Sequence, residues 1–196
     1  MPLLEDNILF YFWRAIVVFT IGFVLSACAT DTIENISPTD KLGKDHAIIV
    51  GRVVTVFDNL QLKVHEANGI LPVANIFIEP SDKNNNQYEK VFAMEVNSGY
   101  LHYTSMQIYP LQANLFGGIN AKYIYAPPGM ITYIGDAYVG MGSKNNTAVA
   151  AGKIVFEKEA ALNDVKAKFP WLLEKYPLNN NEDRKTLSEI AKQTTP

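Results

Sequence analysis

The side chains able to act as nucleophiles or metal ligands are few and far apart in this chain of 196 residues. No two of the histidines His46, His65 and His102 stand three or four residues apart, the spacing at which one element presents two zinc ligands. No Gly-x-Ser-x-Gly sequence occurs, and the glycine-rich segment 140–145 lacks the spacing of a phosphate-binding loop. We therefore predict no catalytic residue, no metal site and no cofactor. An enzyme whose acid–base site forms only in the folded chain is the alternative.

The only thiol of the chain, Cys28, stands directly after an uncharged apolar segment, residues 15–27. As a helix these 13 residues would span ~20 Å, whereas the hydrocarbon core of a bilayer is ~30 Å thick. Such a segment is typical of the apolar part of a secretory signal peptide rather than of a membrane span. A single cysteine also excludes a disulfide within the chain and a zinc site built from several thiolates.

The four residues Leu25-Ser26-Ala27-Cys28 resemble the lipobox of bacterial lipoproteins, in which a leucine and two small residues precede the acylated cysteine. The resemblance implies that the chain is cleaved between Ala27 and Cys28 and that the Cys28 thiol carries a diacylglycerol. Each buried methylene contributes ~0.8 kcal/mol, so two or three acyl chains would hold the protein on a membrane almost permanently. Ala29 stands where an aspartate tends to retain enteric-type lipoproteins on the inner membrane, which favours the outer membrane.

The segment before the apolar run departs from the lipoprotein pattern. Glu5 and Asp6 are acidic, and residues 8–13 are as apolar as the run that follows Arg14. One longer helix over residues 8–29 would bury Arg14 at a cost of roughly 2.5–3.5 kcal/mol. An uncleaved signal anchor, which would make this a single-pass membrane protein, is therefore the alternative to lipidation.

The composition changes after Cys28 and again near His46. Residues 29–44 contain few large apolar side chains and no sustained period, which is typical of a flexible tether. Docking of Ile33 and Ile36 on the domain is the alternative. We expect four parts: a signal peptide at 1–27, the lipidated cysteine and tether at 28–44, a globular domain at 45–178 and a polar tail at 179–196 that is either a frayed helix or disordered.

Short apolar segments of strand type follow one another from His46 onward. Their alternation and their β-branched and aromatic residues predict strands at 46–57, 60–64, 73–79, 91–96, 100–109, 122–125, 130–139 and 148–156. Gly51, inside the first strand, indicates a bulge or the close approach of another backbone. Seven or eight short strands separated by turn residues predict a mainly β chain folded as an antiparallel β-sandwich.

A turn of defined type precedes one of these strands, at residues 126–129. Pro128 fits the first central position of a type II turn, and Gly129 supplies the positive φ that the next position requires. A Pro-Gly turn leading into such a strand resembles the carboxypeptidase-regulatory or prealbumin-like sandwich domains. The resemblance implies that fold but no particular function.

A helical spacing of three or four marks the C-terminal end of the domain, in Leu162, Val165, Phe169, Leu172 and Tyr176. We expect Asn163 to cap the N-terminus of this helix, Pro170 to kink or divide it and Pro177 to end it. The sandwich is therefore expected to carry a C-terminal helix.

Aromatic side chains provide the candidate binding surface. Alternation places Tyr123 and Tyr125 on one face of a strand, where exposed rings can bind a peptide, a glycan or a protein. Trp171 is a further candidate anchor for a partner. The alternatives are cross-strand pairing for the tyrosines and core packing for the tryptophan.

The balance of 17 basic and 20 acidic residues gives a formal charge of -3, which argues against a strongly basic nucleic-acid surface. The sequence predicts a lipid-anchored protein of the cell envelope that faces the periplasm or the exterior. Its expected role is non-catalytic binding or assembly; an envelope-localised hydrolase is the alternative. The expected partners are the membrane, through the acyl chains on Cys28, and another envelope protein.

Overall fold

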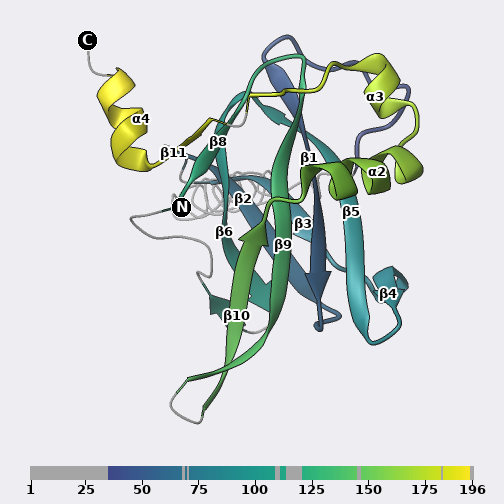
Figure 1. Cartoon of the computed structure of the whole chain (residues 1–196), viewed down its shortest axis with the longest axis vertical. Helices are drawn as coiled ribbons and strands as arrows, with labels where there is room; N and C mark the ends of the chain where they lie inside the picture. The colour runs from purple at the N-terminus through teal and green to yellow at the C-terminus, as the bar shows by residue number, and fades with distance from the viewer. Residues whose placement is uncertain are drawn as a thin grey trace, which may run out of the picture. The chain divides into compact units, whose positions relative to one another are not determined.

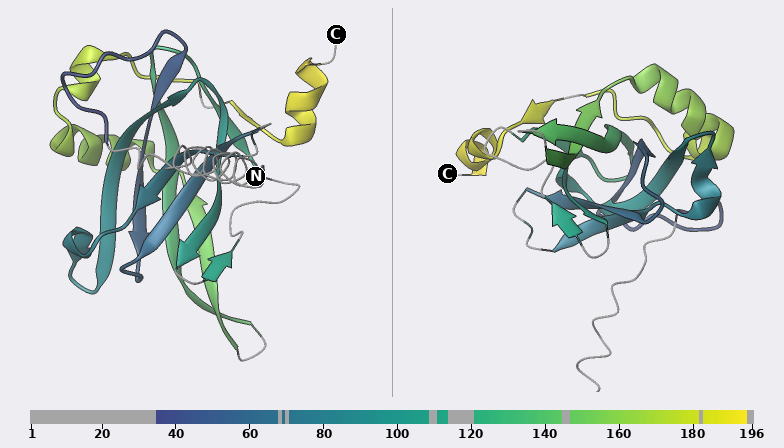
Figure 2. Two further views of the ribbon diagram at one scale, coloured as in Figure 1. Left: turned by 180° about the vertical axis from the view of Figure 1, so that it is seen from behind. Right: turned by 90° about the horizontal axis from the view of Figure 1, so that it is seen from below.

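The computed structural model describes residues 35–67, 69, 71–108, 111–113, 121–144, 147–181 and 183–194. The predicted signal peptide and Cys28 lie outside these residues. The described residues belong to one unit of the chain, Ile33–Pro196. Two facing sheets dominate it, which confirms the predicted mainly β fold and the sandwich (Figures 1 and 2). No helix in this part of the chain has the length and hydropathy to cross a membrane.

The first sheet, sheet A, has the strand order β10-β9-β1-β5-β4. Its strands are β1 (His46–Thr55), β4 (Lys83–Asn84), β5 (Gln87–Asn97), β9 (Ile131–Lys144) and β10 (Thr147–Val155). The β-branched residues of β1 suit a central strand, and most of its side chains are buried on both faces. β1 pairs antiparallel with β5 but parallel with β9, so sheet A is mixed rather than purely antiparallel.

The second sheet, sheet B, has the strand order β11-β8-β6-β2-β3, and β7 also pairs with β6. Its strands are β2 (Leu60–Glu66), β3 (Pro72–Phe77), β6 (Gly99–Ile108), β7 (Leu111–Ala113), β8 (Tyr123–Ala126) and β11 (Arg184–Lys185). All its pairings are antiparallel, as predicted. A single-turn helix, η1 (Pro80–Asp82), connects β3 to β4 and so links the two sheets. The turn before β9 has Gly129 at φ 74°, which confirms the predicted need for glycine there.

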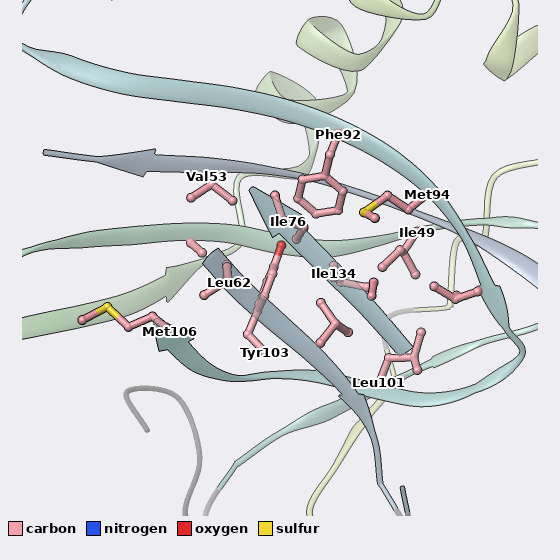
Figure 3. Packing of buried hydrophobic residues seen from close by; sticks show 14 of the residues in the cluster. Ile49, Val53, Leu62, Ile76, Phe92, Met94, Leu101, Tyr103, Met106 and Ile134 are labelled. Carbon is pink, nitrogen blue, oxygen red and sulfur yellow. The ribbon is translucent and has the colours of Figure 1, made fainter. Parts of the chain in front are cut away.

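The main core fills the space between the sheets (Figure 3). Phe92, Met94 and Val96 of β5 all belong to it, as the period of two in this strand predicts. The ring of Tyr103 on β6 stands between the sheets, and its hydroxyl donates a hydrogen bond of 2.9 Å to the carbonyl oxygen of Gly135 on β9. This bond ties sheet B to sheet A through the apolar interior.

Two helices, α2 (Lys158–Lys168) and α3 (Leu172–Lys175), lie on the outer face of sheet A (Figure 1). Val165 and Leu172 are fully buried there against Ile48 and Ile131 in a second core. The prediction that Asn163 caps the helix is wrong, because α2 begins five residues earlier and encloses that residue. No side chain at the N-cap bonds to the helix, and Ala161 and Val165 are the helix residues buried in the second core.

The described body extends beyond both predicted domain boundaries. The buried Ile36 donates its N–H to the carbonyl oxygen of Ala93 at 2.9 Å. This part of the predicted tether is therefore docked on the domain, which was the alternative interpretation for Ile36. At the other end, residues 184–185 form β11 against β8. A third helix, α4 (Leu187–Thr194), begins with a reciprocal cap between Thr186 and Glu189. The predicted polar tail is therefore largely regular structure.

Candidate functional site

A bulge in β9 sets the direction of the polar side chains on the outer face of sheet A. Arg52 of β1 pairs with Asp136 of β9 after a register shift, which leaves one extra residue on β9. Gly135 supplies this residue with φ 101°, and a Cβ on Gly51 would lie only 2.7 Å from its carbonyl oxygen. Both glycines are therefore required, and the predicted close approach at Gly51 is confirmed. The extra residue also brings Asp136 onto the same face as Tyr133.

One guanidinium is surrounded by three carboxylates at this bulge. Nη2 of Arg52 donates to Oδ2 of Asp136 at 3.0 Å and to the hydroxyl of Tyr138 at 3.2 Å. Nη1 donates to Asp164 at 3.1 Å and to Glu89 at 3.3 Å. Asp136 is fully buried, and only 15% of the Arg52 side chain is exposed. We call these five residues the Arg52 cluster; it joins β1, β5, β9 and α2.

The electrostatics of the Arg52 cluster are those of a buried ion pair. Burial raises the pKa of Asp136, and the nearby guanidinium opposes that rise. Burial acts to lower the pKa of Arg52, but Asp136, Tyr138 and Glu89 together outweigh it, so the pKa of Arg52 is raised. The guanidinium remains charged and is held by its partners, which is the chemistry of a structural ion pair.

An open groove of about 370 Å³ adjoins the Arg52 cluster on the outer face of sheet A. It crosses four strands, and α2 does not cover it. Most of its lining is apolar, and its volume lies near the lower end of the range for ligand sites, roughly 300–1,000 Å³. The side chains that matter for its chemistry are Val54, Val56, Gln87, Tyr138, Ala151 and Lys153. We call it the sheet A groove.

Tyr138 connects the Arg52 cluster to the sheet A groove. Its hydroxyl accepts the hydrogen bond from Arg52, and Nζ of Lys153 lies 5.2 Å from the centre of its ring. Among the described residues that line the groove, Lys153 is the only charged one. Within the described residues it forms neither an ion pair nor a hydrogen bond, so the groove presents an apolar floor beside one unpaired cation.

The predicted binding tyrosines lie on the outer face of sheet B, and they differ in exposure. Tyr123 is only 7% exposed; its ring centre lies 5.1 Å from that of His102, and burial raises its pKa. Tyr125 is 41% exposed, and its ring centre lies 5.1 Å from that of Tyr100 on the paired strand. Both tyrosines take part in the cross-strand pairs that were the alternative interpretation.

Trp171 does not share a surface with these tyrosines. Trp171 is partly buried against the second core, on the outer face of sheet A. Nζ of Lys175 lies 5.7 Å from the centre of its ring. The remaining predicted site residues, Ala27 and Cys28, lie outside the described residues. The three partner-binding candidates therefore form no single site in the described part of the chain.

Sequence reasoning did not identify the Arg52 cluster or the sheet A groove. Arg52 and Asp136 are 84 residues apart, and no local spacing joins them. The one available signal was an arginine inside an otherwise apolar strand. A histidine–carboxylate contact, between His46 and Glu95, lies at the opposite end of β1 from the groove. The described ranges contain no group of three or more His, Cys, Asp or Glu side chains able to hold a metal ion.

The fold thus defines the class of this body, a β-sandwich with helices on the outer face of one sheet. Comparison with protein-family models and with curated proteins gives no match to the chain.

Proposed function

We propose that this protein is a lipoprotein of the cell envelope whose β-sandwich binds another envelope component without catalysis. The observation that carries the proposal is Leu25-Ser26-Ala27-Cys28 at the end of an uncharged apolar run, with the only thiol of the chain in the acylated position. The partner of the acyl chains is a membrane, and Ala29 favours the outer membrane. The sandwich then faces the periplasm or the exterior.

The start of the described body limits its distance from such an anchor. Ile36 is buried in the second core, and Oδ1 of Asn35 accepts a hydrogen bond from the N–H of Ala93 at 3.1 Å. Only residues 29–34 separate Cys28 from this contact. A fully extended chain spans at most about 3.6 Å per residue, so these residues reach about 20 Å. A lipidated Cys28 would therefore hold the sandwich close to the membrane surface.

The binding role is supported by the sheet A groove. An apolar groove beside an unpaired lysine is a recognition surface, whereas the guanidinium of the Arg52 cluster next to it is already bound by three carboxylates of the chain itself. The groove lies on the domain and not on the predicted anchor. The protein can therefore be membrane-bound through one part of the chain and bind a partner through another.

The anchor is tested by the intact mass of protein extracted from membranes with detergent. We expect loss of residues 1–27 and a gain of acyl mass on Cys28. Cys28→Ala should remain unprocessed, whereas Ser26→Ala, which keeps a small side chain before the cleavage site, should be processed normally. An unmodified full-length chain in the membrane would overturn the proposal and support the signal anchor.

A further inference from the structure

Five of the described strands have an unpaired edge, and these strands differ greatly in length. One of them, β7, has three residues and pairs only with β6. β4 and β11 have two residues each, and β3 has six with Pro72 at its start. β10 has nine residues and pairs with β9 in unbroken register over its whole length. No other described strand pairs with β10, and Figure 1 shows β9 and β10 extending past the ends of β1 and β5. Natural sheets shorten or interrupt such edges, and β10 is neither short nor interrupted.

The sequence of β10 leaves its backbone accessible for pairing. In an antiparallel edge strand every second residue turns its N–H and C=O away from the paired strand. The side chains of Thr147–Val155 include no proline and a single charge, that of Lys153. β10 therefore presents a row of hydrogen-bonding groups that an extended segment of chain can satisfy.

The sheet A groove lies directly beside this edge. Ala151 and Lys153 of β10 form its margin, and Val54 of β1 and Val56, just beyond that strand, lie further in. A strand added to β10 would direct alternate side chains to this outer face of the sheet. The apolar lining suits small apolar side chains, and the unpaired ammonium of Lys153 suits a carboxylate.

We propose that β10 and the sheet A groove bind an extended peptide segment of a partner protein by strand addition. The segment carries small apolar side chains at alternate positions and one carboxylate that faces Lys153. A second copy of β10 fits less well, because this strand contains no acidic residue to neutralise Lys153. This inference rests on the proposed binding function and states which kind of partner the sandwich binds. It does not depend on the acylation of Cys28.

The test is calorimetric titration of the full-length protein in detergent micelles with a capped nine-residue peptide of alternating valine and threonine with a central glutamate. We expect saturable binding, weakened about fivefold or more by Lys153→Glu. A peptide with lysine in place of glutamate should bind the Lys153→Glu variant more tightly than the unaltered protein. Lys166→Glu, an exposed charge reversal on α2, is the matched control and should change neither affinity.

Backbone pairing is tested separately with two peptides N-methylated at alternate amides. Methylation of the amides that face β10 should abolish binding, and methylation of the other set should leave it intact, because only one set pairs with the edge. Absence of binding by the glutamate peptide, equal effects of both methylated sets, indifference to Lys153→Glu, or self-association of the protein through β10 would each overturn the proposal. Peptide binding with an unmodified Cys28 would instead refute only the lipid anchor.

Discussion

The outer face of sheet A is covered at one end and open at the other. At the covered end Ile48 and Ile131 are fully buried under α2 and α3. At the open end, on the same central strand β1 and just beyond it, Val54 lines the groove and Val56 is 53% exposed. Both ends present β-branched residues, and Val54 is only 8% exposed although no helix residue lines the groove. The two ends therefore differ in whether α2 and α3 cover them and not in the composition of β1.

The Arg52 cluster marks the boundary between the two ends. Asp164 of α2 reaches Arg52 on one side, and Tyr138 leads from Arg52 into the groove on the other. A guanidinium that needs several polar partners cannot be covered by a purely apolar helix face. The cluster therefore both fastens α2 to the sheet and ends the apolar surface that α2 can bury.

The largest effect is expected from Arg52→Met, which breaks this boundary. Asp136 would remain fully buried without its cation, at a cost of about 3–5 kcal/mol in the free energy of unfolding near neutral pH. Loss of the guanidinium removes the strongest of the influences that lower the pKa of Asp136, so its folded pKa rises further above the unfolded value. The deficit should be full above the folded pKa and should fade as the pH falls toward the unfolded pKa.

Urea unfolding of Arg52→Met at neutral and acidic pH measures this effect. The double variant Arg52→Met/Asp136→Asn, which has no buried charge at this position, should recover part of the lost stability and show less dependence on pH. A deficit of equal size at all pH values would show that lost packing of the arginine, and not an unpaired carboxylate, explains it.

A second comparison truncates one apolar side chain at each end. Leu172→Ala at the covered end should cost about 2–5 kcal/mol, because this fully buried side chain would leave a cavity under α3. Val56→Ala at the open end should change the free energy of unfolding by no more than about 0.5 kcal/mol. Thermal unfolding of both variants is the measurement. A large loss for Val56→Ala would mean that the open end is covered in solution.

The sequence was sufficient for the elements that depend on local pattern. The alternation in Phe92, Met94 and Val96 predicted a strand and its inward face, and Gly129 predicted the turn before β9. The parallel pairing of β1 with β9 was not predictable in this way, because a period of two carries no information about the direction of a neighbouring strand. The short strands β4, β7 and β11 are too brief to leave a periodic signal.

The candidate site depends on contacts between distant parts of the chain. The glycine at position 51 indicated a close approach, but only the fold identifies Gly135 as its partner and Asp136 as the neighbour of Arg52. The misplaced start of α2 has the same origin. Ala161 is buried against the sheet although a small side chain adds little to an apolar stripe in sequence. The groove lies on the part of sheet A that α2 does not cover, and no pattern in the sequence predicts where a helix leaves a sheet uncovered.

A smaller loss than that of Arg52→Met or Leu172→Ala is expected from Tyr103→Phe, which removes the hydrogen bond that holds the bulge between the two ends. The hydroxyl of Tyr103 donates to the carbonyl oxygen of Gly135, so its loss leaves a buried acceptor unsatisfied and should cost about 1 kcal/mol. Tyr88→Phe is the matched control: the structure shows no hydrogen bond from the Tyr88 hydroxyl to a described residue, and its removal should be nearly neutral.

Hydrogen exchange of Tyr103→Phe then shows which end of sheet A this bond supports. Faster exchange in β9 beyond Asp136, with unchanged exchange before Gly135, would show that this bond supports the open end, whereas uniform acceleration along β9 would assign it to the stability of the whole sandwich.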